Sequence, residues 1–103
     1  MEPTTIYHIA QKADWQQALL SGLYFPASFD QERFIHCSTS EQVDGVLERY
    51  FQNQSVLKLT IEVAMLIYPL KYEWAISVNQ LFPHIYGPIN LGAVVAIETI
   101  GFS

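Results

Sequence analysis

Hydrophobic and polar positions alternate in several short stretches of this chain. In "VLKLTIEV" the hydrophobic Leu57, Leu59 and Ile61 are separated by polar residues, which predicts a strand with one solvent-facing side. The β-branched and aromatic run from Thr4 to Ile9 predicts a first strand, and "RFIHC" predicts a short one. The apolar "AVVAIETIGF" predicts a closing strand of about six residues.

Two other stretches follow the helical period. Residues Ala13–Ser21 have hydrophobic positions at near-helical spacing, with Asp14 as a possible N-cap and Gly22 as the residue that ends the helix. In "STSEQVDGVLERYF" Ser38 precedes Glu41 by three residues, the spacing of a capping box, and hydrophobic residues follow at i, i+3, i+4, i+7 and i+8. These patterns predict two helices, the second beginning at Ser38.

The order of these elements determines the expected fold class. Strands outnumber helices, and no regular alternation of strand and helix occurs that would predict a parallel sheet. We therefore expect an α+β domain with a split, mostly antiparallel sheet and two helices. A chain of 103 residues without repeats or linkers fits one domain over residues 1–103.

Charge and cysteine content limit the class of protein. Five basic residues against ten acidic ones give a net charge of −5, so bulk nucleic-acid binding is not expected. The lone Cys37 cannot form an internal disulfide, and no leader pattern opens the chain, which together predict a cytoplasmic protein. No apolar stretch approaches the roughly twenty residues of a membrane span.

The stretch "FPHIYGPI", Phe82 to Ile89, has unusual chemistry for its length. A proline near each end fixes the backbone and removes a hydrogen-bond donor, so we predict a rigid loop and not a central strand. In an extended segment His84 and Tyr86 would project to one side, while Phe82 and Ile85 anchor the loop in a core. A structural histidine followed by an ordinary turn is the alternative interpretation.

The other histidines, His8 and His36, lie in the predicted strands. Alternation places Ile35 and Cys37 on one side of "FIHCST" and His36 with Ser38 on the other, so Cys37 is expected to be buried and inert. If Ser38 begins a helix, the free N–H groups of that helix could bind a phosphate or another anion.

Glu73, in "LKYEW", lies among large apolar residues after a proline turn. Paired with His36 or His84, it could act as a general base or accept a ribose hydroxyl. Three histidines and Glu73 would also supply enough ligands for zinc, but the spacings typical of metal sites are missing and no metal is predicted. A Cys or Ser nucleophile is not predicted either, because the motifs that activate one are absent.

Five segments, "IYHI", "GLYFPAS", "RFIHCSTSEQV", "LKYEW" and "FPHIYGPI", resemble in order the motifs of the domain-of-unknown-function family 952. The resemblance covers nearly the whole chain, and it departs at Arg33, where the family usually has Gly; a side chain there could narrow the rim of a site. It implies a fold similar to ADP-ribosyltransferases and RNA 2′-phosphotransferases, with NAD as a possible cofactor. The candidate residues it implies are His8, His36, Ser38, Thr39, Gln42, Glu73, His84 and Tyr86.

Two functions remain open from the sequence. The first is an enzyme, or an enzyme-like binder, acting on a nucleotide or a phosphorylated small molecule, with His36, Glu73 and His84 as the catalytic set. The second is a non-catalytic module for a small ligand or a protein partner, suggested by the high aromatic content; a large exposed aromatic patch would favour it. The aromatic residues include Trp15, Tyr24, Phe25 and Trp74.

Overall fold

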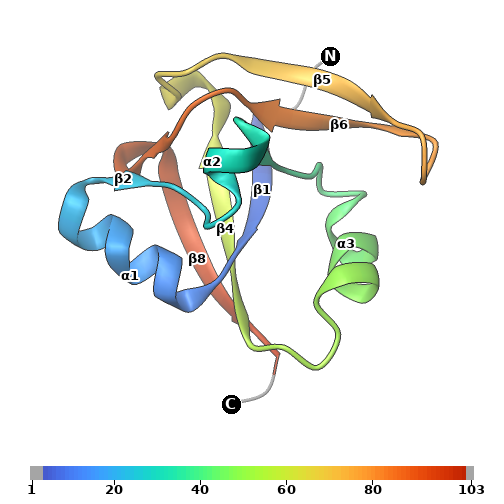
Figure 1. Cartoon of the computed structure of the whole chain (residues 1–103), viewed down its shortest axis with the longest axis horizontal. Coiled ribbons are helices and arrows are strands. Elements are labelled where there is room, and N and C mark those ends of the chain that lie inside the picture. The colour runs from blue at the N-terminus through green and yellow to red at the C-terminus, as the bar shows by residue number, and fades with distance from the viewer. Residues whose placement is uncertain (1–3, 102–103) are drawn as a thin grey trace.

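The computed structural model of the protein describes residues 4–101 (Figure 1). Eight strands, three α-helices and two 3-10 helices follow one another along the chain. In order they are β1 (Thr5–Ala10), α1 (Lys12–Ser21), β2 (Leu23–Tyr24), α2 (Phe29–Glu32), β3 (Ile35–His36), α3 (Val43–Tyr50), β4 (Val56–Glu62), η1 (Val63–Met65), β5 (Leu70–Ala75), β6 (Gln80–Ile85), β7 (Ile89–Asn90), η2 (Leu91–Ala93) and β8 (Val94–Ile100).

The strands form three antiparallel sheets with the orders β1-β4-β8, β2-β7 and β3-β6-β5. The expected small α+β domain with mostly antiparallel strands is therefore confirmed. The third helix, α2, was not predicted, because a single turn of four residues is too short to show a helical period. Phe102, in the predicted closing stretch, lies outside the described residues.

The main core lies between the two three-stranded sheets. Leu59 and Ile61 of β4 are fully buried there, as the alternation in that strand predicts, and α1 adds Trp15 and Ala18. A second, smaller cluster of Ile9, Val43 and Val56 joins α3 to the sheet. Figure 1 shows α1 and α3 on opposite sides of the long strands. Among the described residues no helix is both long and apolar enough to cross a membrane.

Helix α1 ends as predicted but begins differently. Gly22 takes the left-handed conformation at φ 90° and donates its N–H to the carbonyl of Ala18, which ends the helix. Asp14 is not the N-cap: the helix begins at Lys12 after Gln11, and Asp14 lies in the first turn. The Asp14 carboxylate instead accepts the backbone N–H of Ala27, which draws the following loop toward the helix.

Helix α3 begins at Val43, with Gln42 as its N-cap residue, so the predicted cap at Ser38 is wrong. The side chain of Gln42 accepts the N–H of Thr39 at 3.0 Å, which is one half of a capping box shifted by one position. Ser38 is instead bonded in both directions to the backbone of Tyr7 in β1, at 2.7 and 2.8 Å. Pairing with β1 therefore keeps Ser38 extended.

The loop predicted around Pro83 is in fact a central strand. Residues Phe82–Ile85 belong to β6, which lies between β3 and β5. The Pro83 carbonyl accepts the N–H of Cys37 at 2.9 Å, so Pro83 turns its carbonyl toward β3. In an antiparallel pair the nitrogen of that residue points to the same strand, and the proline nitrogen has no hydrogen to donate there. The ladder with β3 ends at this point, and the ladder with β5 is kept. The proline is tolerated because β3 leaves the sheet beside it.

Two further residues have backbone positions that the sequence makes understandable. Arg33 ends α2 in the left-handed conformation at φ 67°, which glycine adopts at lower cost, and this accounts for the Gly expected there in the family. At Gly87, after β6, an added Cβ would overlap the ring of Tyr68. The turn after His84 and Tyr86 therefore requires glycine for space.

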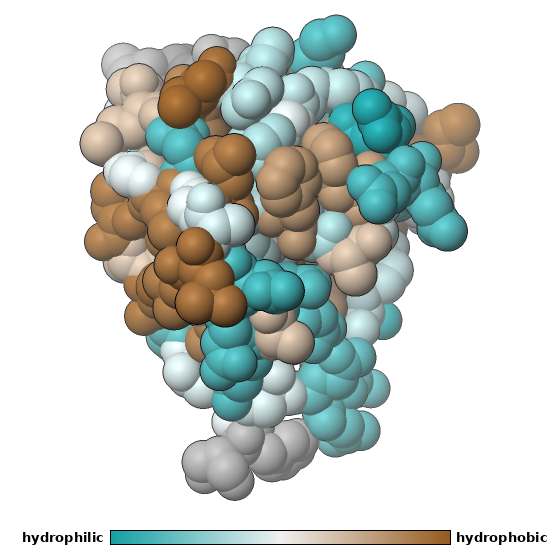
Figure 2. Space-filling view, turned by 60° about the vertical axis from the view of Figure 1, so that its left-hand side comes forward, coloured by the Kyte–Doolittle hydropathy of each residue, from teal (hydrophilic) through white to brown (hydrophobic). Residues whose placement is uncertain are grey.

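Several large hydrophobic side chains remain on the surface. Ile76 and Leu20 are 87% and 85% exposed, and Figure 2 shows hydrophobic side chains gathered toward one edge of the face it displays. Of the four aromatic residues that motivate the interaction-module hypothesis, Trp15 and Tyr24 are buried in the core and do not contribute to an exposed patch. Trp74, at the β5–β6 hairpin, is 55% exposed.

Candidate functional site

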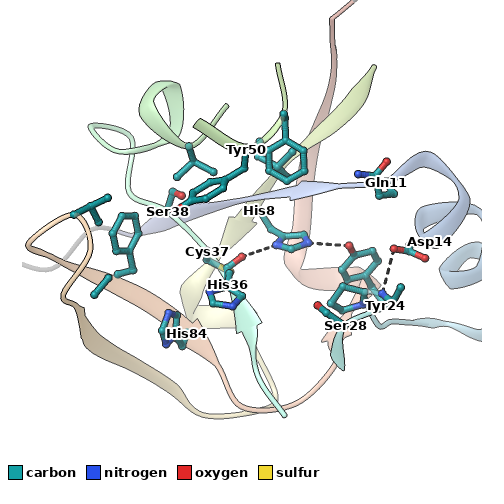
Figure 3. Close-up of a pocket in the computed structure, with 18 of the residues that line it drawn as sticks. His8, Gln11, Asp14, Tyr24, Ser28, His36, Cys37, Ser38, Tyr50 and His84 are labelled. Atoms are coloured by element: carbon teal, nitrogen blue, oxygen red, sulfur yellow. Dashed lines mark hydrogen bonds between the residues drawn. The ribbon is translucent and has the colours of Figure 1, made fainter. Parts of the chain in front are cut away.

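A cavity of about 470 Å³ opens beside β1, β3 and β6 (Figure 3). Four of the residues predicted from the sequence line it, and four do not. Those that line the cavity are His8, His36, Ser38 and His84. Those outside the lining are Thr39, Gln42, Glu73 and Tyr86.

His36 and His84 form a cross-strand pair at one end of this cavity. They lie opposite each other in β3 and β6, with ring centroids 5.1 Å apart and the rings at 80°. The neighbouring pair, Cys37 and Pro83, carries the backbone hydrogen bond, so the two histidines occupy the type of pair whose side chains approach more closely. Alternation turns Ile35 and Ile85 into the core and both imidazoles away from it.

Glu73 pairs with His84 and not with His36. Its Oε1 lies 2.7 Å from Nδ1 of His84 and accepts the hydroxyl of Tyr86 at 2.5 Å. Hydrogen bonds from Tyr86 and then from His84 lower the pKa of Glu73, and the same contact with Glu73 raises the pKa of Tyr86. An ionised carboxylate can only accept, so Nδ1 of His84 donates to Glu73, and Nε2 is the nitrogen left to face a ligand.

Glu32 has the same relation to His36. Its Oε2 lies 3.0 Å from Nε2 of His36, and the hydrogen bond from His36 is the main cause that lowers the pKa of Glu32. The His36 side chain is 56% exposed and that of His84 only 11%, so His36 lies at the mouth of the cavity. Sequence reasoning missed Glu32. The available signal was its position four residues before His36. That spacing predicts a contact only within one helix, whereas Glu32 ends α2 and His36 lies in β3.

Phe34 holds the histidine pair in place and was also missed. Its ring stacks on His84 at 4.3 Å and 24°, and it meets the edge of His36 at 4.8 Å. It is also 5.4 Å from the Tyr86 ring. Alternation places Phe34 on the same side as His36, which was the signal for this contact.

His8 lies deeper and is neutral. Its Nδ1 lies 2.6 Å from the carbonyl oxygen of His36, and its Nε2 lies 2.8 Å from the hydroxyl of Tyr24 (Figure 3). Desolvation lowers the pKa of His8 to about 4, against an ordinary value of 6.5. A carbonyl oxygen can only accept, so the single proton of His8 is on Nδ1.

Ser38 and Cys37, which follow His36, differ in whether their side chains can reach a ligand in the cavity. Ser38 is 4% exposed and lines the cavity, and its hydroxyl has no hydrogen-bond partner within residues 4–101. Cys37 is buried as predicted, and burial raises the pKa of its thiol, which keeps it protonated and unreactive.

Three predicted residues have local structural roles. Thr39 and Gln42 form the turn before α3, and Nε2 of Gln42 also donates to the carbonyl of Leu81 at 2.7 Å. Phe82 is buried, at 8% exposed, as its predicted anchoring role requires, and its side chain also lines the cavity. Phe82 and His84 are two residues apart in β6 and therefore face the same side of the sheet, whereas Ile85 faces the other side and packs in the core. In the part of the chain that the structure describes, no group of three histidine, cysteine or acidic side chains is arranged to hold a metal.

The comparisons with known proteins concern the whole of this fold. The family described as "Protein of unknown function (DUF952)" matches residues 9–97. The chain belongs to this family. Its fold is shared with the crystal structure of CC0527 from Caulobacter crescentus, with a TM-score of 0.86, 28% identity and coverage of 97% of this chain and 89% of that one.

The solution NMR structure of the same Caulobacter protein agrees, with a TM-score of 0.80, 28% identity and coverage of 98% of this chain and 88% of that one. No curated protein matches the chain. Membership in DUF952 therefore establishes the α+β fold and assigns no reaction to the histidine pair.

Proposed function

We propose that this DUF952 domain is an enzyme that binds a small phosphate- or ribose-containing molecule and exchanges protons with it through His36 and His84. One observation carries the proposal. Two imidazoles whose ring centroids are 5.1 Å apart line one cavity, and each has one nitrogen hydrogen-bonded to a carboxylate. NAD, the cofactor implied by the sequence resemblance, is one member of this ligand class.

The carboxylates define what each imidazole can do. Glu73 fixes His84 so that Nε2 accepts a proton when the ring is neutral, and Glu32 leaves Nδ1 of His36 in the same state. Either ring donates once it is protonated, so one can act as the base while the other acts as the acid. Because Glu73 lies behind His84 and outside the cavity lining, we assign it a positioning role.

Phosphate recognition would use the donors at this end of the cavity. A protonated imidazole donates a charge-assisted hydrogen bond, and the Ser38 hydroxyl beside it has no partner within residues 4–101. No lysine or arginine is among the lining residues. The positive charge that a phosphate needs would therefore come from the imidazoles of His36 and His84.

The test combines binding with turnover. Calorimetry would measure binding of inorganic phosphate, AMP, ADP-ribose and NAD, and ³¹P NMR would follow conversion of each phosphorus compound that binds. We expect at least one compound to bind the wild type and to react. His36→Ala and His84→Ala should abolish turnover, and Glu73→Gln should lower it by about 10- to 100-fold, the range for a lost orienting group.

Glu98→Gln is the matched control for Glu73→Gln, because Glu98 is an exposed carboxylate paired with Lys58 on the other sheet. It should leave binding and turnover unchanged. Absence of binding by all four compounds, or equal turnover in the histidine variants, would contradict the proposal.

A second candidate function is a non-catalytic interaction module. It is favoured by the cross-strand pair Trp74 and Leu81, which are 55% and 49% exposed on the β5–β6 hairpin. Ligand binding without any turnover in the NMR experiment would support this second function over the first.

A further inference from the structure

The cavity has a second polar end, away from the histidine pair. Asp14 and Gln11 at the start of α1 and the Tyr24 hydroxyl line it (Figure 3). His8 lies between this end and His36 and is hydrogen-bonded toward both. Neither the proposed proton transfer nor the phosphate contact uses these groups.

The Tyr24 hydroxyl can only accept a further hydrogen bond. His8 carries its proton on Nδ1, where the His36 carbonyl accepts it, so Nε2 is a bare acceptor. The Tyr24 O–H must then donate to Nε2 across the 2.8 Å contact. The proton of the phenol is committed, and only lone pairs remain for a ligand.

Asp14 adds a negative charge to the same end. Its Oδ2 accepts the N–H of Ala27 at 3.3 Å, and Oδ1 has no partner within residues 4–101. Gln11 uses its amide N–H₂ on Gln54, which leaves its Oε1 free to accept. This end therefore presents acceptors, among them the free Oδ1 of the Asp14 carboxylate.

From this polarity we infer that the Asp14–Tyr24 end is a subsite for a hydrogen-bond donor, above all a primary ammonium group. The inference rests on the proposed function for the other end, where the imidazoles receive a phosphate. Hydrophobic side chains lie in the lining as well, among them Val46, Phe51 and Phe82. The ligand class narrows to a phosphate ester with an apolar body and an amine at its far end.

Matched probes separate the two ends of the cavity. 4-(2-Aminoethyl)phenyl phosphate and 4-ethylphenyl phosphate differ by the ammonium group, and tyramine and 4-ethylphenol repeat that difference without phosphate. We expect the wild type to bind the aminoethyl phosphate at least about tenfold more tightly than its ethyl partner, as a charge-assisted hydrogen bond allows.

Asp14→Asn removes the charge and keeps an oxygen for the Ala27 N–H, so the variant should fold and lose the preference while binding 4-ethylphenyl phosphate as before. Asp30→Asn is the control, since Asp30 is exposed in α2 and outside the lining. Equal binding of both phosphates by the wild type, or a preference that survives Asp14→Asn, overturns the subsite and leaves the proposed function standing.

The phosphate-free pair distinguishes the other failure. If neither aryl phosphate binds but tyramine binds more tightly than 4-ethylphenol in an Asp14-dependent way, the subsite holds and the phosphate part of the proposed function falls. If tyramine also fails to bind, the donor subsite is wrong.

Discussion

The two three-stranded sheets use the same kind of antiparallel pairing for different purposes. In β1-β4-β8 the central strand β4 fully buries Leu59 and Ile61. In β3-β6-β5 the central strand buries Ile85 on one face and turns His84 toward a cavity on the other. The first sheet supplies apolar area to the core, and the second supplies the His36–His84 pair to the cavity. Substitutions should therefore affect stability through the first and chemistry through the second.

The largest effect is expected from truncating the first sheet. Leu59→Ala removes a fully buried side chain from the main core and should cost about 2–5 kcal/mol of unfolding free energy, measured by urea denaturation. Leu81→Ala makes the same change at an exposed position of the central strand of the second sheet. Because Leu81 is 49% exposed, it should cost less than about 1 kcal/mol. Similar costs for the two variants would show that the sheets do not differ in this way.

A smaller effect is expected from acid, through His8. The pKa of His8 is about 4 in the folded chain and 6.5 in the ordinary case, so the unfolded chain binds more protons between these values. Stability should be full above pH 6.5 and fall as the pH drops toward 4. The free energy of unfolding should be lower by about 3 kcal/mol once His8 is protonated in both the folded and the unfolded chain. Urea denaturation at several pH values would measure the slope.

His8→Gln separates this effect from other titrations, because a glutamine has a donor and an acceptor for the same two partners and no charge. The variant should lose most of the slope between pH 6.5 and 5. Glu32 and Glu73 have lowered pKa values, so the stability they contribute is lost only at lower pH, below the ordinary value of 4.5. An unchanged slope in His8→Gln would contradict the assignment to His8.

The smallest effect concerns the contact between α3 and the second sheet. Gln42→Ala removes the bond from Thr39 N–H and the bond to the Leu81 carbonyl, and it should cost about 1 kcal/mol. Ser38→Ala should change the denaturation midpoint very little, because Ser38 caps no helix and its hydroxyl has no partner within residues 4–101. A larger loss of stability in Ser38→Ala than in Gln42→Ala would indicate that Ser38 is the cap after all.

Much of the fold could be predicted because it depends on local alternation or on a single residue. Leu59 and Ile61 are buried as their spacing predicts, and Gly22 ends α1. The start of α3 could not be predicted, since "STSEQ" contains two overlapping capping boxes. The choice between them is made by the pairing of Ser38 with Tyr7, which is distant in sequence.

Half of the candidate residues expected from the sequence line the cavity, and the contacts among them were harder to predict. Alternation correctly put His36 on the face away from Ile35 and Cys37. It left open whether Glu73 would meet His36 or His84, and the register of β5 on β6 decides for His84. Glu32 reaches His36 only because Arg33 turns the chain at a positive φ, which sequence spacing did not reveal.

The proline in β6 has a mechanical consequence. Pro83 offers no donor to the segment that follows β3, and this segment changes sheets there. Cys37 is hydrogen-bonded to β6, and the next residue, Ser38, is hydrogen-bonded to β1. His8 in β1 is in turn bonded to the carbonyl of His36. A ligand that displaced His36 would therefore shift both sheets at once, because residues 36–38 connect the β3–β6 wall of the cavity directly to β1.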